Sequence, residues 1–165
     1  MAGLTVAAAR GPVGRMAPVI RIAAPHDPPV TALLHASRAL MQTLFPPEEN
    51  FALDLNGLAA PGVTLWLAEG PSPLGCIALK QAHGYGEVKA MFVTPEARGQ
   101  GVGRALLAKA EARARAVGLP ALRLETGAPL EAAIRLYRAA GFMPCGAFGG
   151  YPEGGSSLFF EKRLA

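Results

Sequence analysis

Apolar residues follow two different spacings along the chain, and each spacing predicts a type of element. After Asp27 and Pro28, apolar residues recur at helical spacing as far as Leu44, which predicts a helix that begins with a capping carboxylate and is stopped by the Phe-Pro-Pro run at 45–47. The same spacing predicts further helices at residues 51–58, 102–117 and 129–140. Alternation bounded by glycine and proline predicts strands at residues 18–23, 63–68, 74–81, 87–93, 121–126 and 156–163.

This order of elements predicts a single mixed domain. Three strands follow one another between residues 63 and 93 with tight turns suited to antiparallel hairpins, and the later strands alternate with helices. We therefore expect an α/β (α+β mixed) fold, with a central mixed, mostly antiparallel sheet of about six to seven strands and helices on both faces. Residues 18–165 are expected to form this domain, and residues 1–17 a flexible N-terminal extension.

Composition and charge narrow the function classes. The formal net charge is +4, but the arginines are scattered and form no basic stripe, so we expect no nucleic-acid partner. No apolar stretch approaches the roughly 18 residues that a membrane-spanning helix needs. The two cysteines, Cys76 and Cys145, match no metal or redox spacing. We therefore expect a cytoplasmic protein that binds no metal.

One segment, residues 91–104, carries the strongest indication of chemistry. A predicted strand ends at Thr94 and Pro95, three glycines follow at alternate positions, and a long helix then begins. The first N–H groups of a helix have no internal partners and bind anions, and glycines let a ligand approach the backbone closely. Arg98 and Arg104 add positive charge, so the segment predicts a pyrophosphate cradle. Neither the dinucleotide fingerprint nor the P-loop motif is present.

Several motifs make a family resemblance specific. The run R-x-x-G-x-G that starts at Arg98 resembles the Arg/Gln-x-x-Gly-x-Gly/Ala signature of the GNAT superfamily of acetyl-CoA-dependent N-acetyltransferases. The run L-Y-R-A-A-G-F that ends at Phe142 resembles that superfamily's L-Y-x-x-x-G-F block. The segments F-P-P-E-E-N at 45–50 and G-E-V-K at 86–89, with an F-F-E-K tail, resemble a bacterial subgroup that carries a Y/F-P-P-E-x-N segment.

The resemblance implies acetyl-CoA as cosubstrate, held mainly by main-chain groups. Amides of the signature bind the CoA pyrophosphate, and the preceding strand, usually bulged where the sheet splays, binds the pantetheine arm. Many members carry an Asn seven residues before the block's tyrosine, whereas this chain has Leu130, so that contact is lost. The implied cofactor-binding residues are Met91, Phe92, Val93, Arg98, Gly99, Gln100, Gly101, Val102, Gly103 and Arg104.

Two residues are candidates for proton transfer. Tyr137 corresponds to the tyrosine that protonates the departing CoA thiolate in the superfamily, although its helical spacing also fits a tyrosine of the core. Glu87 is the candidate for the base that deprotonates the substrate ammonium, directly or through water, and an ion pair with Lys89 is the alternative. Strand alternation predicts one face that carries Glu87, Lys89 and Met91, and an opposite face that carries Val88, Ala90 and Phe92.

The acceptor is the least determined part of the prediction. Glu48 and Tyr151 lie in Pro- and Gly-rich loops that would border the acceptor pocket, and solvated loop residues are the alternative for both. We expect a small-molecule primary amine, such as an amino acid, because the loop at 45–50 would partly cover the acceptor side. Acetylation of a protein N-terminus or lysine, and a CoA-binding sensor without turnover, are the alternatives. The sequence carries no signal for the oligomeric state, and a homodimer is our expectation.

Overall fold

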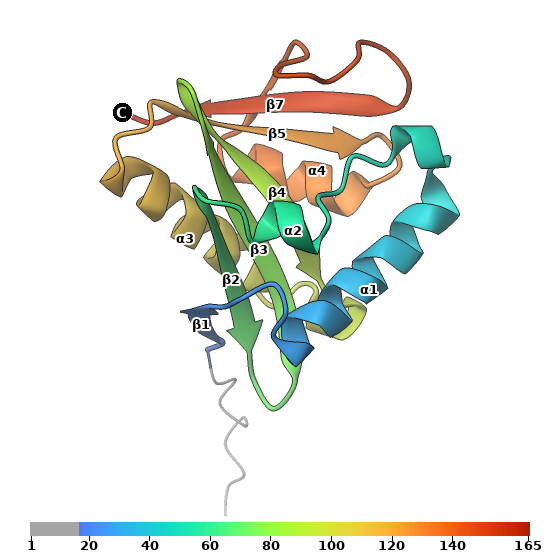
Figure 1. The fold of residues 1–165 in the computed structure, drawn as a ribbon, viewed down its shortest axis with the longest axis vertical. Coiled ribbons are helices and arrows are strands. Elements are labelled where there is room, and N and C mark those ends of the chain that lie inside the picture. Colours follow the sequence, from blue (N-terminus) through green and yellow to red (C-terminus); the bar gives the residue numbers. More distant parts are fainter. Residues whose placement is uncertain (1–16) are drawn as a thin grey trace, which may run out of the picture.

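The computed structural model describes residues 17–165, which form a seven-stranded sheet with helices on both faces (Figure 1). The predicted extension at 1–17 lies outside the described residues except for Ala17. The strands are β1 (Val19–Ile22), β2 (Val63–Glu69), β3 (Pro73–Ala82), β4 (Tyr85–Val93), β5 (Ala121–Gly127), β6 (Met143–Cys145) and β7 (Ser157–Arg163). The α-helices are α1 (Pro28–Leu44), α2 (Leu55–Leu58), α3 (Val102–Ala116) and α4 (Glu131–Ala139).

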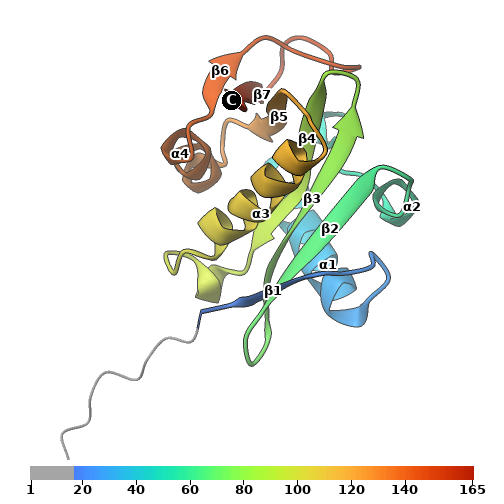
Figure 2. The same cartoon turned by 90° about the vertical axis from the view of Figure 1, so that its left-hand side faces the viewer.

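The sheet runs in the order β1-β2-β3-β4-β5-β7-β6, and every neighbouring pair is antiparallel except β4 and β5. Helices α3 and α4 cover one face and α1 and α2 the other, with the sheet between them (Figure 2). Because side chains alternate along a strand, β2 contributes to the cores on both faces of the sheet. Trp66 points to the α3 side, whereas Leu65 and Leu67 point to the α1 side. The predicted mixed, mostly antiparallel sheet with helices on both faces is therefore confirmed.

Three local predictions need correction. Asp27 occupies the N-cap of α1, but its carboxylate accepts hydrogen bonds from the Ala24 N–H (3.2 Å) and from Arg21 (3.4 Å) and none from the helix. The helix predicted at 51–58 is a single turn, α2, because the Asp54 side chain caps it by accepting from the Gly57 N–H at 2.7 Å. The short edge strand β6 was not predicted, since three residues that include a proline carry little periodic signal.

Strands β4 and β5 part soon after they meet. Their pairing is limited to Gly86 with Leu122 and Glu87 with Arg123. Beyond this point β4 contains a bulge, where the register against β3 shifts and Ala90 adopts a positive φ of 50°. The bulge that the resemblance implied is confirmed, and it opens the sheet between the two parallel strands.

The bulge also overturns the predicted faces of β4. Met91 packs with Val88 on the α3 side, whereas Ala90 and Phe92 pack on the α1 side. Simple alternation had grouped Met91 with Glu87 and Lys89, and Val88 with Ala90 and Phe92. One extra residue in a bulge reverses the phase of every side chain after it, so the prediction was wrong from Ala90 onward.

We expect Gly75→Ala to lower the free energy of unfolding by about 1–3 kcal/mol, the usual cost of overpacking. Gly75 lies in β3 beside the bulged strand, and a Cβ there would lie 2.6 Å from the Phe92 carbonyl oxygen. Because that atom belongs to the backbone, the strand itself must shift. Urea denaturation measures the loss, and Gly146→Ala is the control, since its Cβ would meet nothing within 4 Å. Equal losses in both variants would contradict this account of the packing.

Candidate active site

The segment predicted to be an anion cradle lies where β4 leads through a short 3-10 turn (Pro95–Ala97) into α3. The first intrahelical bond of α3 runs from the Ala105 N–H to the Gly101 carbonyl at 3.0 Å, so the preceding N–H groups have no helical partner. The Gln100 side chain donates to the Glu96 carbonyl at 2.7 Å, and Arg98 Nε donates to the Val93 carbonyl at 3.2 Å. These two bonds brace the loop and leave its amides free for a ligand.

The glycines of the cradle have two different roles. Gly99 and Gly101 adopt left-handed φ angles of 71° and 83°, and a Cβ at either position would meet nothing within 4 Å. Open space directly against the backbone is what close approach of a phosphate requires. Gly103 is different, because its Cβ would lie 2.8 Å from Leu136 and 3.3 Å from Met91. This third glycine lets α3 pack closely on α4 and β4.

The other cofactor-binding candidates surround this cradle. Arg98, Gln100 and Arg104 are exposed, and the Val102 side chain is buried in the core beneath the loop. Residues 91–93 follow the bulge, where β4 no longer pairs with β5. Main-chain groups on that edge therefore have no strand partner in β5 and are available to an extended ligand.

Tyr137 lies on α4 with 5% of its surface exposed, packed edge-on against Phe142 at 5.9 Å between ring centroids. Within residues 17–165 its hydroxyl has no hydrogen-bond partner, and no side-chain polar atom is buried without one, so the hydroxyl oxygen reaches solvent. Burial, with a smaller contribution from the Glu125 charge, raises the pKa of Tyr137. The hydroxyl therefore stays protonated near neutral pH. Leu130, which stands where many members of the superfamily carry an Asn, is the N-cap of α4 and provides no side-chain cap.

Glu87 belongs to a buried polar cluster that we call the Lys89 network, made of Glu87, Lys89, Tyr151 and the Phe51 carbonyl. The Lys89 ammonium donates to the Tyr151 hydroxyl at 2.7 Å and to the Phe51 carbonyl at 2.9 Å, and lies 3.6 Å from Glu87 Oε1. The Tyr151 hydroxyl donates to Glu87 Oε1. Burial, followed by the hydrogen bond to Glu87, raises the pKa of Tyr151. The ion pair predicted as the alternative role of Glu87 is therefore present.

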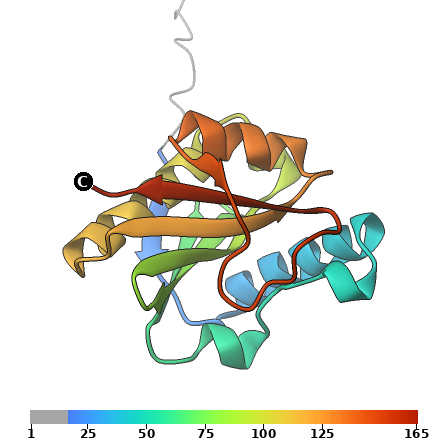
Figure 3. The same cartoon turned by 90° about the horizontal axis from the view of Figure 1, so that it is seen from above.

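Two loops meet over this network. The segment between β6 and β7 crosses to the α1 side of the sheet and runs beside the connection from α1 to α2 (Figure 3). Tyr151 packs edge-on against Phe51 and Phe148, with centroids 5.3 Å apart in each pair, and the Ser156 hydroxyl donates to Glu49. Glu48, the predicted substrate contact, is exposed and is not brought into the network, whereas its neighbour Glu49 ties the loops together.

Sequence reasoning missed one carboxylate at the opening between β4 and β5, that of Glu125. It accepts a hydrogen bond from the Ser157 hydroxyl at 2.8 Å. Burial raises the pKa of Glu125, as does the Glu87 charge more weakly, while the Ser157 hydrogen bond and the Lys89 charge oppose the shift. Strand alternation in β5 places the Glu125 side chain on the face of the sheet opposite to Leu122 and Leu124. The sequence therefore contained a signal that could have identified this residue.

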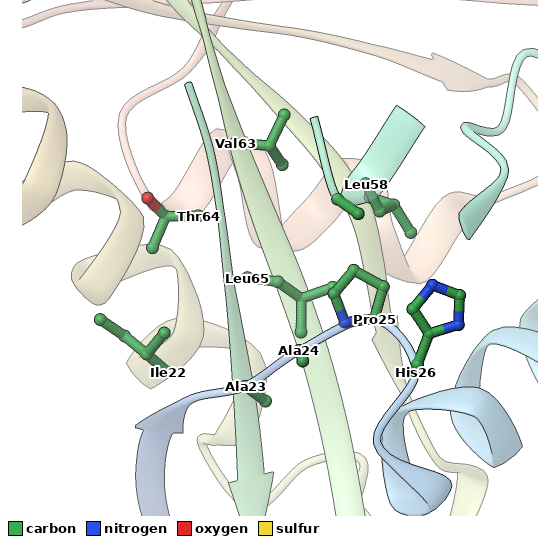
Figure 4. Close-up of a pocket in the computed structure, with 10 residues that line it drawn as sticks. Ile22, Ala23, Ala24, Pro25, His26, Leu58, Val63, Thr64 and Leu65 are labelled. Carbon is green, nitrogen blue, oxygen red and sulfur yellow. The ribbon is translucent and has the colours of Figure 1, made fainter. Parts of the chain in front are cut away.

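An open depression of about 470 Å³ lies between β1, α2 and β2, and no predicted site residue lines it (Figure 4). Apolar side chains such as Leu58 and Leu65 line it together with His26. Within residues 17–165, no group of three or more His, Cys, Asp or Glu side chains is placed to hold a metal ion. No helix in this part of the chain has the length and apolarity needed to cross a membrane.

Comparison with known proteins identifies the family. Residues 31–142 match the model of the acetyltransferase (GNAT) family. The chain is 43% identical over 138 residues to a protein of Azospirillum brasilense named IAA acetyltransferase, covering 82% of this chain and 90% of that one. It is 36% identical over 139 residues to the uncharacterized N-acetyltransferase YsnE of Bacillus subtilis, covering 82% and 92%.

A solved structure agrees with these sequence matches. A Klebsiella pneumoniae protein assigned as an acyl-CoA N-acyltransferase superposes with a TM-score of 0.76 at 34% identity, covering 90% of this chain and 98% of that one. The bulged strand, the glycine cradle and the tyrosine-bearing helix described above lie within residues 31–142, which the family model matches. The chain belongs to the GNAT family of acetyltransferases.

Proposed function

We propose that this enzyme transfers an acetyl group from acetyl-CoA to the primary amine of a small molecule by direct attack in a ternary complex. The observation that carries the proposal is the arrangement around the opening between β4 and β5. The open anion cradle and the protonated Tyr137 lie on the α3 side of this opening. On the α1 side lies a closed wall, made of the Lys89 network and the aromatic ring of Phe51 that packs on Tyr151.

The cofactor side fits CoA in chemistry and shape. We assign the pyrophosphate to the amides of residues 99–104 and to the charges of Arg98 and Arg104, and the pantetheine arm to the backbone of Met91, Phe92 and Val93. The open space against Gly99 and Gly101 supports this assignment. Acetyl-CoA supplies the thioester, and the Tyr137 hydroxyl supplies the proton that the departing thiolate needs.

The acceptor side supports a small amine over a protein substrate. The loops at 45–50 and 146–156 are joined by the bond from Ser156 to Glu49 and by the packing of Tyr151 on Phe51. A peptide would require an open groove where these loops meet.

A panel of acceptors tests this function. Alkylamines, arylalkylamines, diamines and free amino acids are incubated with acetyl-CoA and the enzyme, alongside peptides with a free N-terminus or a lysine. Thiol release and a product mass increased by one acetyl group are measured together. We expect turnover with a small amine and little with peptides, and the reverse preference would identify a protein acetyltransferase.

Tyr151→Phe is expected to raise the KM for the amine about tenfold while leaving the Kd for acetyl-CoA unchanged. The hydroxyl joins Glu87 to Lys89, and hydrogen bonds to charged groups contribute about 1.5–3 kcal/mol each. Its loss loosens the wall without touching the cradle. Steady-state kinetics measure the KM and calorimetry the Kd. An unchanged KM would remove Tyr151 from the acceptor site.

A further inference from the structure

The two strands that part at the site carry opposite charges where they separate. β4 and β5 pair at Glu87 and Arg123, and extending this parallel register by two residues places Lys89 opposite Glu125. Leu122 and Leu124 belong to the core on the α3 side, so the alternate residue Glu125 faces the α1 side, as do Glu87 and Lys89. Glu125 thus stands at the mouth of the opening, on the acceptor side.

We propose that Glu125 is the carboxylate that binds the acceptor's ammonium group and accepts its proton, while Glu87 positions Lys89 and Tyr151 in the wall. The inference rests on the proposed function and deepens it by assigning the acceptor site. It also gives the acceptor a chemical class, a primary amine that arrives as a cation.

The hydrogen bonds of the two carboxylates differ in the way this assignment needs. Ser157 donates to Glu125 Oε1 and fixes the side chain. Oε2 accepts no bond from residues 17–165 and, since no polar side-chain atom there is buried without a partner, it reaches solvent. Glu87 instead accepts from Tyr151, lies 3.6 Å from the Lys89 ammonium and is 7% exposed. A carboxylate already paired with a cation and a hydroxyl is a poor proton acceptor.

The surroundings of Glu125 raise its pKa above the ordinary glutamate value. Burial, and more weakly the Glu87 charge, favour the neutral form of Glu125, while the Ser157 hydrogen bond and the Lys89 charge favour its ionised form, and the balance raises its pKa. Glu125 in turn raises the pKa of both Tyr137 and Tyr151, so its charge acts on the donor side and the acceptor side alike. A base whose pKa lies closer to the working pH transfers protons more effectively than an ordinary glutamate.

Glu125 and Tyr137 together account for every proton transferred in the reaction. The ammonium gives one proton to Glu125 Oε2, and the neutral nitrogen forms its bond to the acetyl carbon as the carbon–sulfur bond breaks. The Tyr137 hydroxyl protonates the departing thiolate. The second proton, which the nitrogen loses on becoming an amide, restores Tyr137, and Glu125 releases its proton to solvent.

Three matched variants test the assignment with the best acceptor of the panel. Glu125→Gln is expected to lower kcat/KM by about 10²–10⁴-fold, as loss of a general base does, and to remove the rise in kcat/KM with increasing pH. Glu87→Gln is expected to keep that rise and lose activity chiefly through KM. Glu131→Gln, whose side chain is 82% exposed at the start of α4, is the control and should match the wild type. Acetyl-CoA binding should be unchanged in all three.

A pH-dependent rise that is lost in Glu87→Gln and kept in Glu125→Gln would overturn the inference and leave the proposed function standing. Failure of the wild type to bind acetyl-CoA would instead end the proposed function. A second measurement needs no acceptor: the side-chain carboxyl resonance of Glu125 is titrated in the wild-type protein by carbon NMR. A midpoint above the ordinary glutamate range supports the inference, and a midpoint within that range overturns it.

Discussion

Gly101→Glu is expected to weaken acetyl-CoA binding about 100-fold or more while the protein stays folded. Gly101 is the N-cap of α3, with a φ of 83° and open space at its Cα. A glutamate there would fill the space against the amides and bring a negative charge to the phosphate site. Loss of two charge-assisted hydrogen bonds of about 1.5–3 kcal/mol each accounts for the change, since 1.4 kcal/mol corresponds to tenfold.

Gly118→Glu provides a closely matched control at the other end of the same helix. Gly118 has a φ of 75° and is exposed, and a Cβ at this position, as at Gly101, would meet nothing within 4 Å. The backbone strain and the charge change are therefore the same in both variants. Calorimetric titration should show near wild-type affinity for Gly118→Glu. Similar weakening in both would mean that strain or net charge, and not the cradle, determines binding.

Tyr137→Phe is expected to lower kcat about 10²–10³-fold without changing the Kd for acetyl-CoA. The substitution removes only the hydroxyl that reaches solvent and keeps the ring that packs on Phe142. Loss of a positioned general acid typically costs a factor within about 10²–10⁴. Single-turnover kinetics with a small amine, together with calorimetry, measure the two quantities separately.

The same variant distinguishes catalysis from the alternatives. A CoA-binding sensor would show no turnover in the wild type and an unchanged response in Tyr137→Phe. A tyrosine that serves only the core would leave kcat unchanged and lower the thermal stability. A fall in kcat with intact acetyl-CoA binding and intact stability assigns the hydroxyl to proton transfer.

Much of the fold could be predicted because its signals are local. The long helices and the alternating strands each bury one continuous apolar set, and glycine and proline mark their ends. The errors occurred where a few residues determine the cap or the length of an element. Hydrogen bonds that the Asp27 and Asp54 carboxylates accept redirected one helix cap and shortened α2 to one turn. The three-residue strand β6 had too little periodicity to be detected.

In the candidate site, too, the contiguous part could be predicted and the part built from distant residues could not. The cradle at 98–104 is contiguous, so its glycines and arginines could be identified from their spacing. The Lys89 network could not, because Lys89 bonds to Phe51 and Tyr151, 38 and 62 residues away along the chain. The bulge at Ala90 reversed the faces of β4, and the role of Glu125 depends on where two strands part.

Calorimetric titration of the wild-type protein with acetyl-CoA, with NAD as the comparison ligand, tests the central claim most directly. The account predicts saturable binding of acetyl-CoA with one site per chain and no binding of NAD, because the cradle lacks the dinucleotide fingerprint. Absence of acetyl-CoA binding, or equal binding of both ligands, would contradict the assignment of the cradle and the acetyltransferase function built on it.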